Sequence, residues 1–185
     1  MCLSHLWTAV SNHGGFVLQT EGDQLRAFFP NEKNHAPLAM ALRAASEMHA
    51  KLALVEQQFR EQNLFASADS RLVFRAGLTE GEIRLVWQNT GGVRHAAWID
   101  AGHGTAMAEA TRLMNLERQV PRAERDTNIL VPERLAGQAL LQTPEFKEGW
   151  SLRDQDMAGK QDNPSRVAVY QIRAQARSPN LKNTA

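Results

Sequence analysis

The chain has 185 residues, of which 43% are hydrophobic, 22% charged and 6% aromatic, values typical of a single globular domain. Its 21 basic and 20 acidic side chains give a net charge of +1, which leaves no surplus of cations to hold a nucleic-acid backbone. No run of about 18 apolar residues is present to cross a bilayer. The single cysteine, Cys2, excludes an internal disulfide and a cysteine-cluster zinc site.

These properties predict a cytoplasmic protein with neither a nucleic-acid partner nor a membrane span. The first residues also lack the basic segment, apolar core and small-residue cleavage site of a secretion signal. We therefore expect Met1 to open the folded part of the chain. The expected domain covers residues 1–173, and residues 174–185, which have no apolar period, are expected to form a flexible tail.

The N-terminal segment predicts a short amphipathic helix followed by a hairpin. Apolar residues at helical spacing are Leu3, Leu6, Trp7 and Val10. Gly14 and Gly15 follow them and suit the end of a helix. Two strand-like runs, 16–20 and 24–29, then flank Gly22-Asp23, which predicts a tight hairpin with Asp23 at its tip.

The middle of the chain predicts a long helix and a second hairpin. Apolar residues spaced by three and four form one stripe between His35 and Glu61, which is typical of a packing helix. Runs 71–78 and 82–87 flank Thr79-Glu80-Gly81, which predicts a hairpin with its turn at these residues. A Gly-rich loop, 89–93, then leads into residues 95–100.

The rest of the chain predicts a helix over about 105–118, a strand at 128–131, a helix beginning at Pro132 and a last strand at 166–172. This order of elements predicts an α+β sandwich, with helices covering an antiparallel sheet.

Four segments, in order, resemble motifs of the catalytic domain of class III nucleotidyl cyclases, the adenylate and guanylate cyclase family. The segments are HGGFVLQTEGDQLRAFF, FRAGLTEGEIRL, GTAMAEATRLMNLE and NILVPERLAG. Each motif alone is common, but the four are collinear over roughly residues 8 to 172. The resemblance implies a ferredoxin-like antiparallel sheet with covering helices. It begins in the helix that follows the family's first strand, so we expect that strand to be missing.

Cyclisation of a nucleoside triphosphate requires the ribose 3′ oxygen to displace pyrophosphate, and two metal ions commonly stabilise the charge that develops. The resemblance implies Mg²⁺ or Mn²⁺ held by two aspartates, one on the first strand and one in the Gly-Asp turn. Asp23 occupies the second place. The alternative is that Asp23 is only a turn residue, since Gly-Asp suits hairpin turns whatever the function.

The resemblance also implies positions that recognise the purine base. Gln19 stands where the family often has Lys or Glu, and a neutral amide can pair with either purine. The equally weighted alternative is a strand residue that faces solvent. The second base position falls at Asp100 or Ala101.

The family's transition-state pair is an Asn and an Arg four residues apart, which places both on one helix face. Arg112 matches the Arg, and its guanidinium suits a phosphate; Ala108 stands at the Asn position. The alternative for Arg112 is a solvated helix residue. Lys160 matches a phosphate-binding lysine, although Ala158 replaces the lysine before it. A rival metal site at His95, Asp100 and His103 is weaker, because loop histidines at such spacing define no fixed geometry.

The sequence therefore predicts a class III nucleotidyl cyclase homology domain of the cyclic-nucleotide signalling family, with weak or no activity as an isolated chain. The expected ligand is a purine nucleoside triphosphate, and the resemblance implies a homodimer or heterodimer with sites between protomers. The alternative is a non-catalytic nucleotide-binding or dimerisation module that keeps the cyclase fold.

Overall fold

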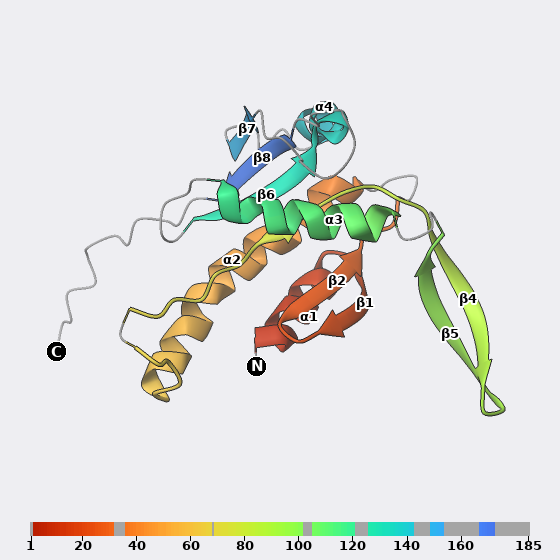
Figure 1. The fold of residues 1–185 in the computed structure, drawn as a ribbon, viewed down its shortest axis with the longest axis horizontal. Helices are drawn as coiled ribbons and strands as arrows, with labels where there is room; N and C mark the ends of the chain where they lie inside the picture. The colour runs from red at the N-terminus through yellow and green to blue at the C-terminus, as the bar shows by residue number, and fades with distance from the viewer. Residues whose placement is uncertain are drawn as a thin grey trace.

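A computed structural model describes residues 2–31, 36–67, 69–101, 105–120, 126–142, 149–153 and 167–172. The chain forms three sheets and four main helices in this part, arranged as Figure 1 shows. Within these residues no helix is both long and apolar enough to cross a membrane. The predicted tail, 174–185, lies outside the described residues.

The first sheet is the predicted N-terminal hairpin. It follows α1 (Cys2–Asn12) and consists of β1 (Phe16–Glu21) and β2 (Gln24–Phe28), which pair antiparallel. Gly22 turns the chain with φ of 58°, a conformation that glycine adopts without steric cost. Asp23 follows it, exposed at the tip, so this prediction is confirmed.

The second sheet has the order β3-β6-β8-β7. Its strands are β3 (Ala76–Gly77), β6 (Thr127–Pro132), β8 (Val167–Ile172) and β7 (Trp150–Arg153). Three strands run antiparallel, but β3 pairs parallel with β6. The predicted antiparallel pairing is confirmed for β6, β8 and β7. The edge strand β3 runs parallel to β6, because a long crossover through a hairpin and a helix brings the chain back in the same direction.

The third sheet is a hairpin whose turn lies later in the chain than the sequence pattern predicted. β4 (Ile83–Thr90) and β5 (Val93–Asp100) pair over their whole length, and Gly91 and Gly92 form the turn with φ of 60° and 82°. Two consecutive glycines supply the positive dihedrals of a two-residue turn. The predicted hairpin at Thr79-Glu80-Gly81 is therefore wrong, since the Leu78 N–H instead donates to Leu130 O and joins this segment to the second sheet.

The helix α2 (Pro37–Glu61) packs against both of the first two sheets. Its buried Ala44 and Met48 contact the side chains of β1 and β2, and its Leu42 and Ala45 contact Ile129 and Tyr170 of the second sheet. Phe74, just before β3, packs in both clusters, so they are continuous under the two sheets. The long helix predicted over 35–61 is confirmed.

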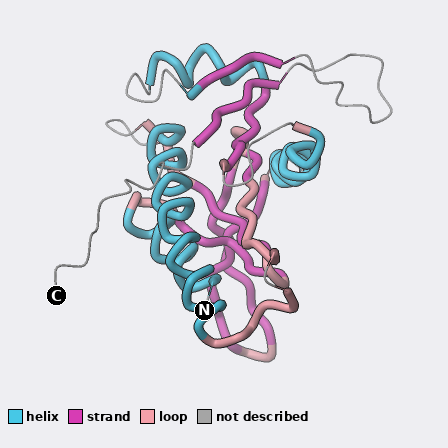
Figure 2. The backbone as a smooth tube through the Cα atoms, turned by 90° about the vertical axis from the view of Figure 1, so that its left-hand side faces the viewer, coloured by secondary structure: helices cyan, strands magenta, loops and turns pink. Residues whose placement is uncertain are grey.

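The opposite face of the second sheet is covered by α3 (Thr105–Leu116), which continues as a 3-10 turn, Glu117–Gln119. Leu113 and Leu116 pack against Leu130, Val167 and Val169. Figure 2 shows the strands between α2 and α3. A Cβ at Gly77 would lie 2.2 Å from Ala110 O, so the helix approaches β3 closely because residue 77 has no side chain.

A shorter helix, α4 (Glu133–Gln142), directly follows β6, as predicted. Its Leu135 and Ala136 pack against Val131 and Ala168, on the face of the sheet that also carries α2. Alternate residues of β6 thus enter different clusters on opposite faces, as strand geometry requires.

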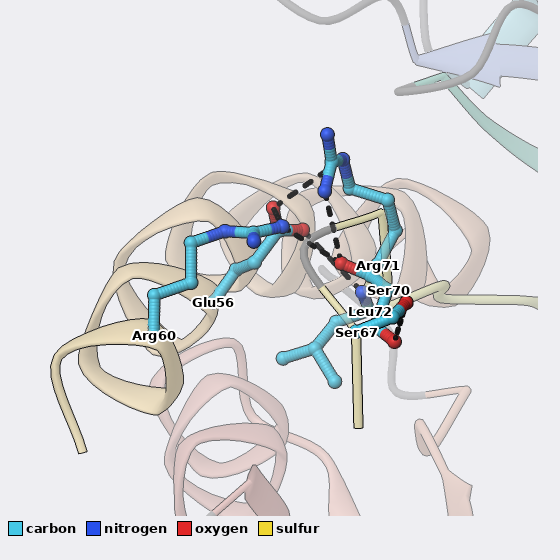
Figure 3. Close-up of polar contacts among 6 residues, drawn as sticks. All are labelled: Glu56, Arg60, Ser67, Ser70, Arg71 and Leu72. Atoms are coloured by element: carbon cyan, nitrogen blue, oxygen red, sulfur yellow. Dashed lines mark hydrogen bonds and ion pairs between the residues drawn. The ribbon is translucent and has the colours of Figure 1, made fainter. Parts of the chain in front are cut away.

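The segment between α2 and β3 is held to the helix by one carboxylate, that of Glu56 (Figure 3). Glu56 accepts hydrogen bonds from Arg60 Nη2 at 3.1 Å and from the Leu72 backbone N–H at 3.3 Å, and Arg71 Nε lies 3.7 Å away. Arg60 and Arg71 both donate to Ser70 O, at 2.7 and 3.0 Å. These contacts set the path of the chain into β3.

A second carboxylate is fully buried at the C-terminal end of α3. The side chain of Glu117 has no exposed surface, and Arg75 Nε lies 3.1 Å from its Oε2. A buried carboxylate requires a cation beside it, because desolvation without one is costly. The pair therefore ties the end of α3 to the residue that precedes β3.

We expect Arg75→Met to lower the free energy of unfolding by about 3 kcal/mol, because it removes the Arg75 guanidinium from beside the buried Glu117 carboxylate. Chemical denaturation measures the change. Arg84→Met is the matched control: Arg84 pairs with Glu82 at 2.6 Å, but both side chains are largely exposed, so little change is expected there. Equal effects of the two substitutions would contradict this assignment.

Candidate functional site

Asp23 lies at the exposed tip of the first hairpin, where turn chemistry predicted it. Its position next to Gly22 leaves the carboxylate in solvent. Within the described residues, no hydrogen bond or ion pair joins Asp23 to Gln19 or Arg112. The carboxylate is thus accessible to a cation, but the residues that the structure describes do not surround it with further ligands.

Gln19 lies on β1 next to an irregularity of pairing. The register shifts between Val17 and Gln19, so Gln19 pairs across the hairpin with Arg26. Arg26 Nη1 donates to Gln19 Oε1 at 3.0 Å. Gln19 is exposed, and its side-chain NH₂ group can still donate a hydrogen bond. The contact therefore occupies the oxygen of this amide, and its NH₂ group is the part that can still donate.

Arg112 and Ala108 occupy the exposed face of α3, one turn apart, as the spacing predicted. Arg112 makes no ion pair with another described residue, but it is close enough to Glu109 for its charge to help lower the pKa of that carboxyl. Its guanidinium is exposed. The methyl group of Ala108 provides no hydrogen bond beside it.

Asp100 is the last residue of β5, and its carboxylate is hydrogen-bonded to the backbone of α3. Its Oδ2 accepts a hydrogen bond from the Met107 backbone N–H at 3.1 Å, in the first turn of α3. The first N–H groups of a helix have no partner inside the helix, and a carboxylate there also interacts favourably with the helix dipole. This contact explains why an acidic residue stands at the end of β5 without requiring a base to be recognised.

The remaining predicted positions lie outside the described part of the chain. Lys160 and His103 are in segments that the structure does not describe, and only the backbone of His95 is described, paired with Gln88. Among the described residues, no group of three or more His, Cys, Asp or Glu side chains is placed to hold a metal ion.

A charged network that sequence reasoning missed joins α3, α4 and the segment after β3. Arg134 donates to Glu109 Oε1 at 2.7 Å and to Thr79 Oγ1 at 2.9 Å, and the Thr79 hydroxyl donates to Glu109. The hydrogen bond from Arg134 holds the pKa of Glu109 below its ordinary value, against the opposing effect of burial. Glu109 and Arg134 are 25 residues apart, so no local spacing reveals the pair.

A cavity of about 760 Å³ lies between the first hairpin and the second sheet. Ala27, Phe28 and Phe29 line one side, and Gly77 and Leu78 line the other. The remaining walls come from the start of α2, from α3, from α4 and from Trp98 of β5. Most of the lining is apolar, and among the described residues no lysine or arginine contributes to it.

The sequence matches no protein-family model and no curated protein. Several solved structures resemble the chain, among them three cyclases. The adenylyl cyclase CyaB from P. aeruginosa has a TM-score of 0.59 and 17% identity, with 95% of this chain and 80% of that chain covered. The guanylyl cyclase Cya2 has a TM-score of 0.63 and 16% identity, with 97% and 80% covered.

The third structure is a bacterial light-regulated adenylyl cyclase, with a TM-score of 0.55 and 19% identity; the match covers 91% of this chain and 42% of that one. The chain therefore has the fold of the class III nucleotidyl cyclase catalytic domain. The predicted resemblance and the α+β class are confirmed at the level of the fold. The predicted roles of individual site residues remain predictions.

The network around Glu109 should make the free energy of unfolding depend on pH. Because folding lowers the pKa of Glu109, the ionised carboxylate stabilises the folded state at neutral pH. This stabilisation is lost as the pH falls through the folded-state pKa, which lies below the ordinary glutamate range. We expect Arg134→Met to cost about 1 kcal/mol at neutral pH, a modest value because Arg134 is half exposed. The difference from wild type should shrink at pH ~3.

Denaturation at both pH values, with Arg118→Met as the control at an exposed arginine outside the network, measures this effect. A destabilisation that stays constant on acidification would show that Arg134 acts through packing and not through the Glu109 carboxylate.

Proposed function

We propose that this chain is a nucleotidyl cyclase homology domain that binds a purine nucleoside triphosphate and forms dimers, with little or no cyclase activity of its own. The observation that carries the proposal is the cyclase fold with Asp23 at the hairpin tip and Arg112 on the exposed face of α3. The proposed location is the cytoplasm, in keeping with a chain that has one cysteine.

The low activity follows from the groups that the site lacks. Ala108 stands where an amide would stabilise the transition state, and among the described residues no second carboxylate lies beside Asp23 to hold a pair of metal ions. Loss of one such group typically lowers a rate by about 10²–10³, so several losses together reduce turnover severely. Binding can persist, because phosphate affinity requires only cations and donors.

In the proposed complex, Arg112 binds a phosphate with its paired donors and Asp23 ligates one Mg²⁺ or Mn²⁺ ion through its exposed carboxylate. Gln19 contacts the base with its amide, and Lys160 adds a second phosphate contact. Asp100 is the weakest member of this set, because its carboxylate already receives the Met107 N–H. The metal would supply charge neutralisation at the phosphates.

Turnover and binding, measured on the same preparations, test this proposal. With Mn²⁺ and ATP or GTP, we expect cyclic nucleotide to form no faster than in Asp23→Ala. Calorimetry should show binding that weakens about tenfold or more in Arg112→Ala, because a charged phosphate contact is lost. Arg118→Ala is the control at another exposed arginine.

Rapid product formation that Asp23→Ala abolishes would contradict the loss of activity and establish Asp23 as a metal ligand. Absence of binding to ATP and to GTP, with and without Mg²⁺, would leave only the second candidate function, a dimerisation module.

The hairpin β4–β5 favours this second candidate. It projects away from the body of the molecule (Figure 1) and exposes large apolar side chains along its length. Trp87 and Val93 are 60% and 66% exposed. Arg94 lies over the Trp87 ring, 4.7 Å from its centroid. Trp87 and Val93 lie on opposite faces of the hairpin. Apolar side chains exposed on a projecting hairpin are typical of a protein–protein contact, and a second copy of the chain is the proposed partner.

We expect the wild-type chain to sediment as a dimer or a higher species at high micromolar concentration, and Trp87→Ser with Val93→Ser to shift it toward the monomer. Leu54→Ser on α2 is the matched control, since Leu54 is 62% exposed but lies outside the hairpin. A 20.6 kDa monomer at all concentrations would contradict the dimer. An unchanged association in the double variant would exclude the hairpin as the contact.

A further inference from the structure

Glu109 is the acidic neighbour of Arg112 on α3. It lies three residues before Arg112, and residues at this spacing are neighbours on a helix surface, with side chains that lean toward the N-terminal end of the helix. A glutamate on the N-terminal side of a basic residue is also the favourable order for an ion pair within a helix. Glu109 is therefore the side chain of α3 that can compete with an anion for the Arg112 guanidinium.

In the folded chain, that carboxylate has another partner. Arg134, the second residue of α4, donates from Nη1 to Glu109 Oε1 at 2.7 Å and from Nη2 to Glu109 Oε2. The Thr79 hydroxyl also donates to Oε2. Paired hydrogen bonds from one guanidinium to one carboxylate are among the strongest that an arginine makes. Both oxygens of Glu109 are thus occupied by groups from outside α3.

Arg134 is itself held in the orientation that this pairing needs. Its Nη2 donates to Thr79 Oγ1 at 2.9 Å, and its Nε lies 3.7 Å from Glu80 Oε1. Thr79 and Glu80 follow β3, so contacts to two separate segments fix the guanidinium. The Glu109 side chain is 22% exposed. Because little water competes for this carboxylate, its attraction to a nearby cation is stronger than that of a fully solvated group.

We infer that Arg134 is a positioning residue for Arg112: by occupying the Glu109 carboxylate, it leaves the Arg112 guanidinium to a phosphate of the nucleotide. The inference rests on the proposed function in one respect, namely that Arg112 is a phosphate contact. Arg134 acts through Glu109 in this arrangement and does not itself contact the nucleotide.

Removal of Arg134 should change what Arg112 binds. In Arg134→Met, the Glu109 carboxylate loses its paired donors, and Arg112, the basic residue of the same helix, can take their place. A phosphate then has to displace the carboxylate before it binds. Ion pairs of this kind are modest, so the expected loss of affinity is about two- to fivefold.

A double-mutant cycle, measured by calorimetric titration of the full chain with ATP and with GTP, each with Mg²⁺, tests the inference. We expect Arg134→Met to weaken binding about two- to fivefold in the wild-type background. The same substitution should leave binding unchanged in Glu109→Gln, because that variant has no carboxylate to pair with Arg112. Arg118→Met removes one positive charge just beyond α3 and is the control for a general loss of charge.

A second measurement does not require a nucleotide. Carbon-13 NMR follows the pKa of the Glu109 carboxyl, and Arg112→Ala is the perturbation. We expect Arg112→Ala to raise this pKa about twice as far or more in Arg134→Met as in the wild-type background, because Arg112 is the partner of Glu109 only when Arg134 is absent. If Arg134→Met does not fold, Arg134→Gln replaces it, since an amide can still donate to Thr79 without carrying a charge.

Equal weakening by Arg134→Met in both backgrounds of the binding cycle would overturn the inference, because Arg134 would then act through its own charge or through the fold. Equal changes of the Glu109 pKa with and without Arg134 would overturn it too, whether or not a nucleotide binds. If neither nucleotide binds to the wild-type chain, the proposed function fails. In that case a larger pKa change in the absence of Arg134 would still establish that Arg134 keeps Arg112 apart from Glu109.

Discussion

The packing of α2 under two separate sheets is the constraint on which the rest of the structure depends. The helix has 25 residues, so it is about 37 Å long and can serve both sheets at once. Ala44 and Met48 contact one sheet, and Leu42 and Ala45 contact the other. No backbone pairing joins the two sheets in the described part of the chain, so their relative position is set through the side chains of this helix and Phe74.

The sequence predicted the elements whose signals are local. The apolar period identified α2, and the Gly22-Asp23 turn located Asp23 at a hairpin tip. The second hairpin was misplaced because Gly81 imitates a turn while Gly91 and Gly92 form the real one. The four residues of β7 were not predicted, since so short a strand is defined by its pairing with β8 and not by its own pattern.

In the candidate site, too, features with a local signal could be predicted and features without one could not. Arg112 could be placed on an exposed helix face from spacing alone. The partners of the polar groups could not be predicted, because the paired residues are far apart in the chain or joined across a loop. The pairs are Glu109 with Arg134, Glu117 with Arg75, and Asp100 with the Met107 N–H. These three carboxylates maintain the relation between α3 and its neighbours. Much of the acidic character around this helix thus serves the architecture, while Asp23 stays in solvent.

The close approach of α3 to β3 has a consequence for how substitutions would be tolerated. A side chain at position 77 would need the space of Ala110 O, Leu113 Cβ and Met114 N, all within 2.7 Å of its Cβ. The helix would then have to rise from the sheet and carry Arg112 with it. The placement of Arg112, the exposed cation of this helix that suits a phosphate, therefore depends on a residue with no side chain. Two strands, β4 and β5, separate that residue from the helix in the chain.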